Sequence, residues 1–497
     1  MSGVSRRALQ IGPGDTVAVA LTDLSVGDTV DIGGASVRLV DAIQRGHKFA
    51  LAKHAKDDRV LKYGAPIGVA TRPIEIGEHV HEHNIRTTLS GLSMYAYEPA
   101  PPTIASPAAG EFAGYCRADG RVGVRNEIWI IATVGCVANA CIKIAAISND
   151  RYAGRTDGVH AITHPFGCSQ LGDDLESTRR ILAGLACHPN AGGVLIVGLG
   201  CESNRIDGLL AAAPQLDRTR LRIVRAQSDE DEVEAGVAAI AALVERAEQD
   251  VRTPCPASDL VLGLKCGGSD GLSGLTANPL LGRLAERVVA AGGSAILTEI
   301  PEIFGAEQLL MARAVDERVF ERIAALTNGF KSYFMAHNQP VHENPSPGNK
   351  DGGISTLEEK SLGAVQKAGG ATVSDAIEYG DSIKTRGLTL LEAPGNDAVS
   401  GTALAAAGAT LILFTTGRGT PLGFPAPTLK IASNSDLAKR KPRWIDFDAG
   451  AVLGDQTVED VDAAFLRCVL ETASGKPAAN ESNGERSIAI WKRGVTL

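Results

Sequence analysis

The sequence has little of what several classes of protein require. It carries nine cysteines in 497 residues, and a count that is both low and odd argues against a disulfide framework. No apolar stretch reaches the roughly 20 residues that a membrane-spanning helix needs. The first twenty residues also lack the continuous apolar core of a secretory signal. We therefore expect a cytoplasmic protein with no membrane partner.

An excess of basic residues is absent as well. The formal net charge of −9 gives no support to a nucleic-acid partner, and the short basic run at 439–443 is typical of a solvated loop. Hydrophobic residues at 44% and charged residues at 22% are ordinary for a globular enzyme. The chain is too long for one core, so the length predicts several domains.

The pattern of apolar runs divides the chain into parts. Residues 1–97 show short apolar runs between glycine-rich turns, which predicts a small all-β domain. Residues 98–112 are rich in Pro and Ala and read as a linker. Strand-then-helix units follow, and a break near residue 255 separates a first α/β lobe, 113–255, from a second lobe with a C-terminal segment, 256–497. The predicted fold class is multidomain α/β with Rossmann-like lobes and mostly parallel sheets.

Continuous rather than alternating apolar runs indicate strands that are buried on both faces. Residues 229–249 carry apolar side chains at helical spacing, with Ser228 as the expected N-cap. The expected strands of the α/β lobes are 128–134, 159–163, 193–197, 221–224, 260–264, 294–298 and 410–415.

Four cysteines stand directly after expected strands, beside glycine or lysine: Cys136, Cys168, Cys201 and Cys266. In a parallel α/β sheet, ligands bind beyond the carboxyl ends of the strands, and thiolates there suit soft-metal binding. Simple packing is the alternative for any one of them, since cysteine is among the most buried residue types. Cys136 opens an apolar helix and is the doubtful member of the four.

Polar residues flank these cysteines. His164 lies four positions before Cys168, and Glu202 follows Cys201. Lys265 precedes Cys266 between an apolar strand and two glycines, where an ammonium could lower a thiol pKa or bind a carboxylate. Ser269 and Asp270 follow in the same loop.

The end of the first domain holds the segment His79-Val-His81-Glu-His83, and His47 lies in another short strand of that domain. Histidines at this spacing share one face of a strand and could bind a metal or an anion. An exposed polar face is the competing interpretation.

Two polar loops shaped by Gly and Pro complete the set of candidates. The loop 342–353 contains Asn344 and Lys350, and the loop 415–423 contains Arg418. Long polar loops inside a compact enzyme are more often part of a site than a spacer. The segment 198–203 resembles half of a dinucleotide fingerprint, but Ser203 replaces the last glycine, which disfavours nicotinamide binding.

Several strings together resemble the altronate/galactarate dehydratase family. They are Gly114-Tyr-Cys-Arg-Ala-Asp-Gly-Arg-Val-Gly-Val-Arg-Asn126, Thr163-His-Pro-Phe-Gly-Cys-Ser-Gln-Leu-Gly-Asp-Asp174, His188-Pro-Asn-Ala-Gly-Gly193, Gly198-Leu-Gly-Cys-Glu202, Gly263-Leu-Lys-Cys-Gly-Gly-Ser-Asp-Gly271, Thr276-Ala-Asn-Pro279 and Glu343-Asn-Pro-Ser-Pro-Gly-Asn349. Residues 1–97 resemble the β-clip (SAF) module of the same family through His47-Lys-Phe-Ala-Leu51, Lys62-Tyr-Gly64 and His81-Glu-His-Asn84.

The resemblance implies a metal-dependent hydro-lyase that converts a sugar acid of the altronate type to a 2-keto-3-deoxy acid. It implies iron as the cofactor, with manganese as a second option, and leaves an iron–sulfur cluster open. A galactarate dehydratase or a sulfolactate sulfo-lyase is the alternative within the family. Outside it, the alternatives are a sugar-acid-binding protein and an NAD-dependent dehydrogenase. We expect a homo-oligomer, a dimer, acting on a small-molecule sugar acid.

Site roles follow from these motifs as predictions. Three thiolates serve as iron ligands, and the histidines of the first domain are the alternative ligands. The predicted metal ligands are Cys168, Cys201 and Cys266, with His81 and His83 as the alternative. The predicted catalytic residues are His47, His164, Glu202 and Lys265. The predicted substrate-binding residues are Ser269, Asp270, Asn344, Lys350 and Arg418.

Overall fold

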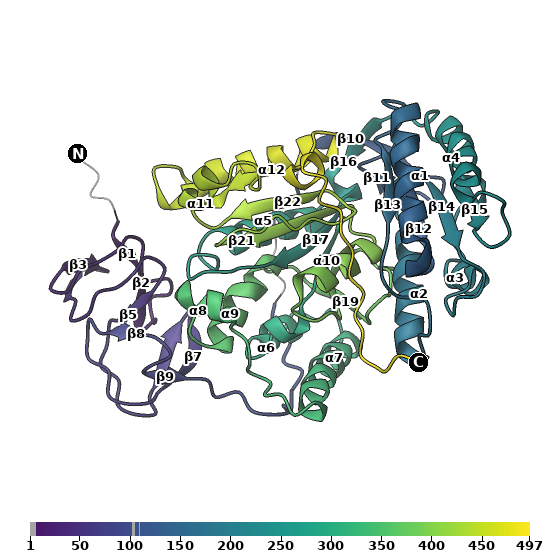
Figure 1. Ribbon diagram of the computed structural model, residues 1–497. Coiled ribbons are helices and arrows are strands. Elements are labelled where there is room, and N and C mark those ends of the chain that lie inside the picture. Colours follow the sequence, from purple (N-terminus) through teal and green to yellow (C-terminus); the bar gives the residue numbers. More distant parts are fainter. Residues whose placement is uncertain (1–5, 102–104, 109) are drawn as a thin grey trace.

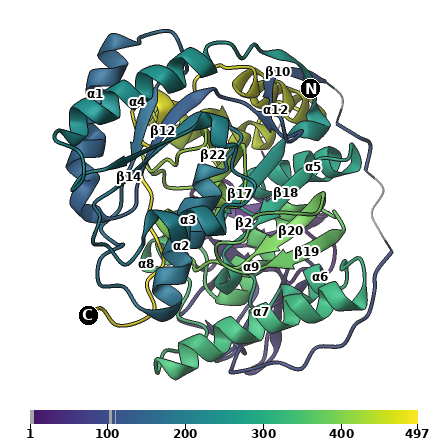
Figure 2. The same cartoon turned by 90° about the vertical axis from the view of Figure 1, so that its right-hand side faces the viewer.

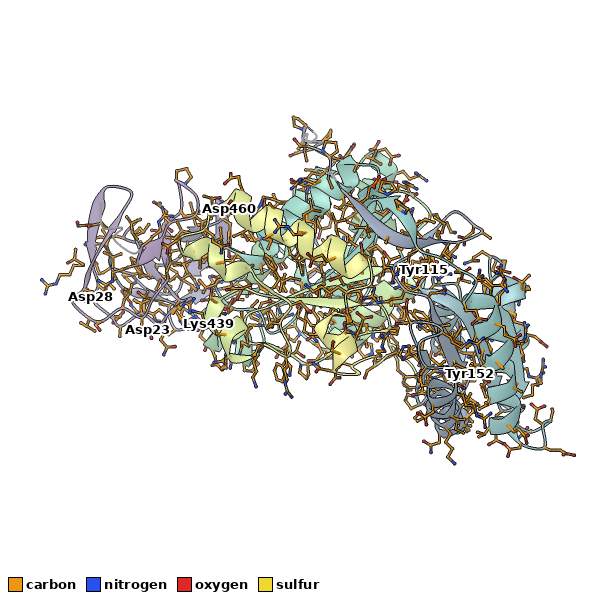
Figure 3. All side chains as sticks on the ribbon, turned by 90° about the horizontal axis from the view of Figure 1, so that it is seen from above. Asp23, Asp28, Tyr115, Tyr152, Lys439 and Asp460 are labelled. Carbon is orange, nitrogen blue, oxygen red and sulfur yellow. The ribbon has the colours of Figure 1, made fainter. Side chains whose placement is uncertain are left out.

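Three regions follow one another along the long axis of the molecule (Figure 1). The computed structural model describes residues 6–101, 105–108 and 110–497. Seen from above, Asp23 and Asp28 mark the β-rich end, Lys439 and Asp460 the middle, and Tyr115 and Tyr152 the opposite end (Figure 3). Residues 102–104 and 109 of the expected linker lie outside the described residues, as do residues 1–5 of the expected first domain.

The N-terminal region consists of short antiparallel strands joined by tight turns. One sheet has the order β1-β2-β5-β8, a second pairs β3 with β4, and a third has the order β6-β7-β9. The strands are β1 (Ala8–Leu9), β2 (Val17–Ala20), β3 (Thr29–Ile32), β4 (Ala35–Arg38), β5 (Lys48–Ala50), β6 (Arg59–Lys62), β7 (Ala65–Ala70), β8 (His79–Val80) and β9 (Ile85–Arg86).

The first α/β lobe is built on a parallel four-stranded sheet with the order β13-β12-β14-β15. Its central strands are buried along their whole length, because helices cover both faces. The strands are β12 (Glu127–Ala132), β13 (Val159–Ile162), β14 (Ala191–Gly198) and β15 (Leu221–Arg225). The helices are α1 (Ala138–Arg151), α2 (Gly172–Ala186), α3 (Ile206–Ala212) and α4 (Glu232–Ala247).

The second α/β lobe has a parallel seven-stranded sheet with the order β19-β20-β18-β17-β21-β22-β23. Its strands are β17 (Val261–Cys266), β18 (Ser294–Leu297), β19 (Val373–Ile377), β20 (Gly387–Leu391), β21 (Leu411–Thr416), β22 (Thr428–Ala432) and β23 (Phe447–Asp448). Its helices are α5 (Ala277–Ala290), α6 (Glu307–Met311), α7 (Glu317–Ala336), α8 (Pro347–Asp351), α9 (Leu357–Ala364), α10 (Asp397–Ala406), α11 (Ser435–Arg440), α12 (Val458–Ala473) and α13 (Ala479–Ser482).

Residues 89–101, which follow the N-terminal region, run along the second lobe (Figure 2). The Tyr95 hydroxyl donates to Glu307 of α6 at 2.6 Å, and the Ala100 N–H donates to the Ala312 carbonyl at 2.7 Å. The N-terminal region therefore lies against the second lobe, although the first lobe follows it in sequence. No helix in the described part of the chain combines the length and hydrophobicity of a membrane span.

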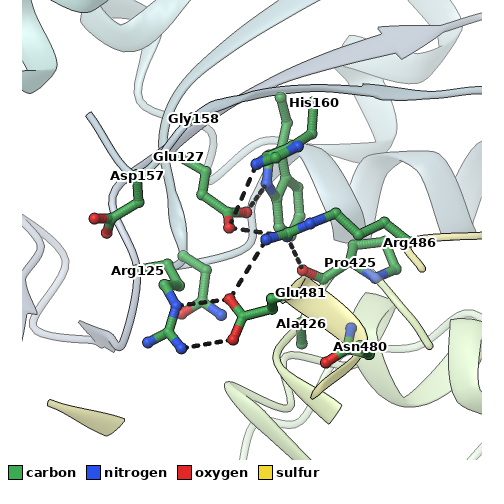
Figure 4. Close-up of polar contacts among 12 residues, drawn as sticks. Arg125, Glu127, Asp157, Gly158, His160, Pro425, Ala426, Asn480, Glu481 and Arg486 are labelled. Atoms are coloured by element: carbon green, nitrogen blue, oxygen red, sulfur yellow. Dashed lines mark hydrogen bonds and ion pairs between the residues drawn. The ribbon is translucent and has the colours of Figure 1, made fainter. Parts of the chain in front are cut away.

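An ionic network ties the two lobes together (Figure 4). Arg125, just before β12, donates two hydrogen bonds to Glu481 of α13, at 2.8 and 2.7 Å. Arg486 lies 2.8 Å from the fully buried carboxylate of Glu127. A small antiparallel sheet, with the order β11-β10-β16, consists of β10 (Glu111–Cys116), β11 (Val122–Gly123) and β16 (Thr253–Pro256). It contacts the segment after α12, where the Ala113 N–H donates to the Ser474 hydroxyl at 3.1 Å.

The predicted fold class is confirmed, and each of the seven expected α/β strands is present within a few residues of its predicted bounds. Two details differ. The helix expected from residue 229 begins at Glu232, because Asp231 and not Ser228 caps it, accepting from two backbone N–H groups. Four strands of the second sheet, β19, β20, β22 and β23, lay outside the prediction.

Candidate active site

Three histidine rings of the N-terminal region face the second lobe. Nδ1 of His47 lies 3.1 Å from Nε2 of His79, and the ring centroid of His81 lies 5.2 Å from that of His47. Nε2 of His47 is 3.2 Å from the carbonyl oxygen of Asp351, so the proton sits on Nε2 and Nδ1 keeps its lone pair. His81 contacts the same lobe, with Nδ1 2.7 Å from the Ser355 hydroxyl.

Burial keeps these rings neutral. It lowers the pKa of His47. Burial, followed by the charges of His47 and His81, lowers the pKa of His79 to about 3. Burial and the neighbouring Lys48 ammonium lower the pKa of His81 to about 4. Neutral imidazoles carry a lone pair, so they can bind a metal at neutral pH.

A buried ion triad lies beneath the histidines. The carboxylate of Glu359, on α9, accepts from Lys48 at 2.8 Å and from Lys62 at 2.7 Å, and all three side chains are almost fully buried. Burial would raise the pKa of Glu359, but the two ammonium groups outweigh it and lower the value to about 2. Burial lowers the pKa of Lys48 to about 8. Lys48 also donates to Ser355 at 2.5 Å, which fixes the start of β5, directly after His47.

Close backbone contacts seat the N-terminal region on the second lobe. A Cβ atom at Gly271 would lie 1.9 Å from the carbonyl oxygen of Gly46, and one at Gly353 would lie 2.4 Å from the same oxygen. Only glycine permits such an approach. The turn that precedes His47 therefore packs directly against the loops after β17 and α8.

Two cationic side chains lie beside the histidines on the second lobe. Lys350 of α8 pairs with Glu82 at 2.8 Å, and both remain substantially exposed. Arg418, exposed after β21, donates to the Gly348 carbonyl at 3.2 Å. Exposed cations at the mouth of a polar site are suited to binding a carboxylate.

Hydrogen bonds connect the loop after β17, which carries Ser269 and Asp270, with the loop 342–353 and with Ser433 after β22. Asn349 donates to the Ser269 carbonyl at 2.9 Å, and Asp270 accepts from the Ser433 hydroxyl at 2.8 Å. Lys360 donates to Asn344 at 2.9 Å and to Asn349 at 3.0 Å. The structure thus brings the five predicted substrate-binding residues into one connected group of loops.

Behind these loops, Cys266 ends β17 within a fully buried set of charges. Among the residues that the structure describes, Cys266, Glu299 and Glu302 form the one set of three His, Cys, Asp or Glu ligand atoms that all lie within 4.8 Å of one another. Glu299 holds a left-handed backbone, φ 71°, a strained conformation typical of functional sites. The trio is compatible with a metal cofactor.

Ammonium groups already neutralise this trio. Lys367 donates to the Cys266 sulfur at 2.8 Å, Lys265 lies 2.7 Å from Glu299, and Lys360 lies 2.8 Å from Glu302. Burial, followed by the Glu302 charge, raises the pKa of Cys266 to about 12, so the sulfur carries its proton. A dication placed here would have to displace a buried ammonium.

The histidine pair fits a divalent ion without such a displacement. Two ligands about 2.1 Å from a metal and at right angles to each other lie about 3 Å apart, close to the 3.1 Å between His47 and His79. Imidazole suits iron, and manganese accepts mixed nitrogen and oxygen ligands. The Asp351 carbonyl fixes the His47 tautomer, as outer partners of metal ligands do.

The predicted thiolate ligands do not come together. Cys266 is buried in the seven-stranded sheet, whereas Cys168 and Cys201 are exposed after β13 and β14 of the other lobe. Of the alternative ligands, His81 joins the histidine group. The exposed His83 lies at its edge, with its ring centroid 5.4 Å from that of His79.

His164 and Glu202 brace loops in the first lobe. Nε2 of His164 lies 2.9 Å from the Ala132 carbonyl, and its Nδ1 accepts from the Phe166 N–H at 3.1 Å. Glu202 accepts from Thr133 at 2.8 Å. Both ring nitrogens of His164 therefore have a hydrogen-bond partner in the backbone. Lys265 is likewise buried, between Glu299 and Asp397.

Sequence reasoning passed over several residues of this site. His79 belongs to the histidine segment but is not among the predicted site residues, and Lys48, which directly follows His47, is not among them either. Glu359 and Lys360 lie in the charged run 358–360, which reads as a solvated helix face although all of α9 is buried. Composition alone does not reveal that a charged run such as 358–360 belongs to a buried helix.

Three family models match consecutive parts of the chain. Residues 6–88 match "Altronate/galactarate dehydratase SAF domain", residues 114–248 match "D-galactarate dehydratase/Altronate hydrolase, second domain", and residues 257–496 match "D-galactarate/Altronate dehydratase, C-terminal". Together they cover the N-terminal region and both lobes.

Named relatives align over almost the full length. The chain is 50% identical over 486 residues to an altronate dehydratase of Escherichia coli, covering 97% of this chain and 98% of the relative. It is 49% identical over 499 residues to an altronate dehydratase of Bacillus subtilis, covering 98% and 99%. A galactarate dehydratase (L-threo-forming) of E. coli is 33% identical over 492 residues, covering 93% and 92%.

Proposed function

Because the chain belongs to the altronate/galactarate dehydratase family, it is a sugar-acid dehydratase, a hydro-lyase, and we propose that its substrate is altronate. The observation that carries this choice is the full-length similarity to two altronate dehydratases, at markedly higher identity than to the galactarate dehydratase. The reaction removes water from C2 and C3 of the acid and yields a 2-keto-3-deoxy acid.

The reaction has two chemical demands. A weakly acidic proton must leave C2 beside the carboxylate, and hydroxide must leave C3. The enol that forms then tautomerises to the keto acid. The site must therefore hold the carboxylate, accept one proton and return another to the departing hydroxyl.

The metal that we propose is divalent iron, with manganese as the second option, held by His47 and His79. The donor set supports this, because two neutral imidazole nitrogens lie at the separation of adjacent ligands. A bound divalent ion would polarise the carboxylate and a hydroxyl of the substrate as a Lewis acid. The predicted set Cys168, Cys201 and Cys266 is the alternative that ligand variants must test.

Lys350 and Arg418 bind the substrate carboxylate in this proposal. Both are exposed cations on neighbouring loops, and Arg418 contacts the carbonyl two residues before Lys350. A guanidinium and an ammonium together form charge-assisted hydrogen bonds to a carboxylate. Asp270 and Asn344, on the same connected loops, are the groups that we assign to the hydroxyls.

His81 moves the proton in this proposal. Its Nδ1 contacts the Ser355 hydroxyl, which leaves Nε2 to accept the C2 proton. Burial and nearby cations lower its pKa to about 4, and a bound carboxylate would raise that pKa again toward neutrality. The imidazole therefore becomes a stronger base when the substrate is present.

The test is a product assay with purified full-length protein under anaerobic, iron-replete conditions. We expect release of 2-keto-3-deoxy acid from altronate, with a lower kcat/KM on galactarate and sulfolactate. Removal of the metal with a chelator should abolish the reaction, and Fe²⁺ or Mn²⁺ should restore it. Product from galactarate alone would replace altronate as the substrate, and no product from any acid would end the proposal.

A further inference from the structure

Three exposed cysteines lie at the carboxyl ends of the strands in the first lobe. None of them takes part in the proposed elimination. Cys136, Cys168 and Cys201 follow β12, β13 and β14, which lie side by side in that sheet (Figure 1). Cysteine is among the most buried residue types, so three exposed thiols at one sheet edge call for an explanation other than packing.

The strand register places the three cysteines at the same level. Ile131 of β12 pairs with Ile162 of β13 and with Ile196 of β14, all in parallel strands. Cys136 and Cys201 each stand five residues after their isoleucine, and Cys168 stands six residues after its own. Since neighbouring strands are about 4.8 Å apart, the loops that carry the thiols emerge next to one another.

Backbone hydrogen bonds join the three loops. The Gly135 N–H donates to the Phe166 carbonyl at 2.9 Å, and the Asn204 N–H donates to the Gly167 carbonyl at 3.0 Å. Each bond engages a residue within three positions of a cysteine. Gly167, at φ 97°, could not carry a side chain, because its Cβ would lie 2.2 Å from the Thr133 carbonyl oxygen.

Side chains next to the cysteines add to this rigidity. Asn204 donates from its amide to the Thr133 carbonyl at 3.0 Å, and Glu202 accepts from the Thr133 hydroxyl at 2.8 Å. His164 spans the first two loops through Ala132 and Phe166. The polar residues of these loops hold the backbone, while the thiols stay exposed, with weak contacts from Gln227 to the Cys201 sulfur at 3.5 Å and between Cys168 and Ser169 at 3.8 Å. Such a rigid frame is what a preorganised ligand set requires.

The spacing argues against a single ion bound by all three thiols and is compatible with a polynuclear centre. The set Cys266, Glu299 and Glu302 is the only ligand group of the described chain that meets the 4.8 Å criterion, so these three sulfurs do not converge on one point. The ligands of an iron–sulfur cluster bind different irons and stand further apart than the ligands of one ion. Cys141, the next cysteine along, is buried in the apolar core under α1 and is not a fourth ligand.

We propose that Cys136, Cys168 and Cys201 bind a [4Fe–4S] cluster through three of its irons. The fourth iron is left to an oxygen ligand, from water or a hydroxy acid. This site is separate from the histidine site and stands on its own observations, so it does not rest on the choice of altronate as substrate.

The experiment measures iron and acid-labile sulfide in the full chain after anaerobic purification or reconstitution. Wild-type protein should hold about four sulfides per chain and about four irons beyond the ion at the histidine site, with the visible absorption of a cluster and an electron paramagnetic resonance signal after reduction. Cys136→Ser, Cys168→Ser and Cys201→Ser should each lose at least half of the sulfide. Cys116→Ser, which changes an exposed cysteine of β10, is the matched control and should keep it.

Circular dichroism and a second series of Cys→Ala variants separate loss of the cluster from loss of the fold. Iron without sulfide in the wild type, or wild-type sulfide in all three variants, would overturn the proposal. Wild-type protein that takes up no sulfide even on reconstitution, yet dehydrates altronate with Fe²⁺, would overturn the cluster while leaving the proposed function intact. Cluster binding without activity on any acid would overturn the proposed function and leave the cluster proposal intact.

Discussion

Nδ1 of His47 faces Nε2 of His79 at 3.1 Å across two antiparallel strands, β5 and β8, of the N-terminal sheet. The register pairs Phe49 with His79, and the turn before β5 brings His47 back over the strand end. The Asp351 carbonyl of the second lobe then fixes the His47 ring. The pairing of β5 with β8 therefore brings the two rings together, and the contact with the second lobe fixes the His47 ring.

Replacing either histidine of the pair should remove the bound metal. We expect His47→Gln and His79→Gln to lower iron content at the histidine site, and with it kcat, by at least tenfold, because each removes a neutral nitrogen ligand. Metal analysis after dialysis against a fixed Fe²⁺ or Mn²⁺ concentration measures the loss. His337→Gln, at the exposed end of α7, is the control. Unchanged Mn²⁺ binding in both variants would move the metal to another site.

Acid should destabilise the wild type through the same rings. In the folded protein the pKa values of His79 and His81 are about 3 and about 4, below the usual value near 6.5. Between about pH 4 and pH 6.5, the unfolded chain therefore binds more protons than the folded protein. Stability is then fully present above about pH 6.5 and is lost as the pH falls toward 4. The metal-free His79→Gln/His81→Gln variant should show a smaller drop in melting temperature between pH 7 and 5. Equal drops would contradict the assigned burial of these rings.

Loss of a carboxylate-binding cation should appear in substrate binding. A charge-assisted hydrogen bond contributes about 1.5–3 kcal/mol, which corresponds to about a tenfold or greater change. We expect Arg418→Ala to raise the KM for altronate by roughly that factor, with Arg418→Lys in between. Steady-state kinetics measure it. Lys439→Ala, a basic residue near the end of α11, should leave KM unchanged. An unaltered KM in Arg418→Ala would place the carboxylate elsewhere.

The fold class followed from patterns that act locally. Continuous apolar runs identified β12, β14 and β17, because strands covered on both faces must be apolar throughout. The apolar runs of β19, β20 and β22 are interrupted by Asp375, Thr389 and Lys430, and these strands are defined by pairing with the rest of the sheet. Local capping also misled, since Ser228 and Asp231 are both good N-caps and only the turn before α4 decides between them.

The site was harder to predict, because it joins residues that are far apart in sequence. The composition of their loops predicts Lys350 and Arg418 as site residues, and the histidine motif predicts His81. No sequence pattern predicts that Lys48 and Lys62 both bind the carboxylate of Glu359 on α9, 311 and 297 residues later. The four strand-end cysteines looked equivalent in sequence, but they fall in two separate sheets, and burial distinguishes Cys266 from the other three.

The carboxylate of Glu359 is the ionic centre between the N-terminal region and the second lobe. Removing its charge would leave two buried ammonium groups without a counter-ion, which typically costs about 3–5 kcal/mol. We expect Glu359→Gln to lower the apparent denaturation midpoint strongly and to expose the N-terminal region to protease. Glu471→Gln, which breaks the exposed pair with Lys476, should cost about 1 kcal/mol or less. Similar midpoints for the two variants would show that the triad is solvated.

Cysteine reactivity separates the buried thiol from the exposed ones. Burial, followed by the charge of Glu302, raises the pKa of Cys266 to about 12, so at pH 8 its sulfur is both protonated and shielded from solvent. The thiolate is the reactive species, and we therefore expect native, metal-free protein to alkylate Cys136, Cys168 and Cys201 while Cys266 reacts only after denaturation. Mass spectrometry of the labelled peptides measures each site, with the buried Cys141 as the internal reference for protection. If Cys266 is labelled in the native protein as fast as Cys201, the lysines and glutamates around it open to solvent, and the burial of Cys266 does not persist in solution.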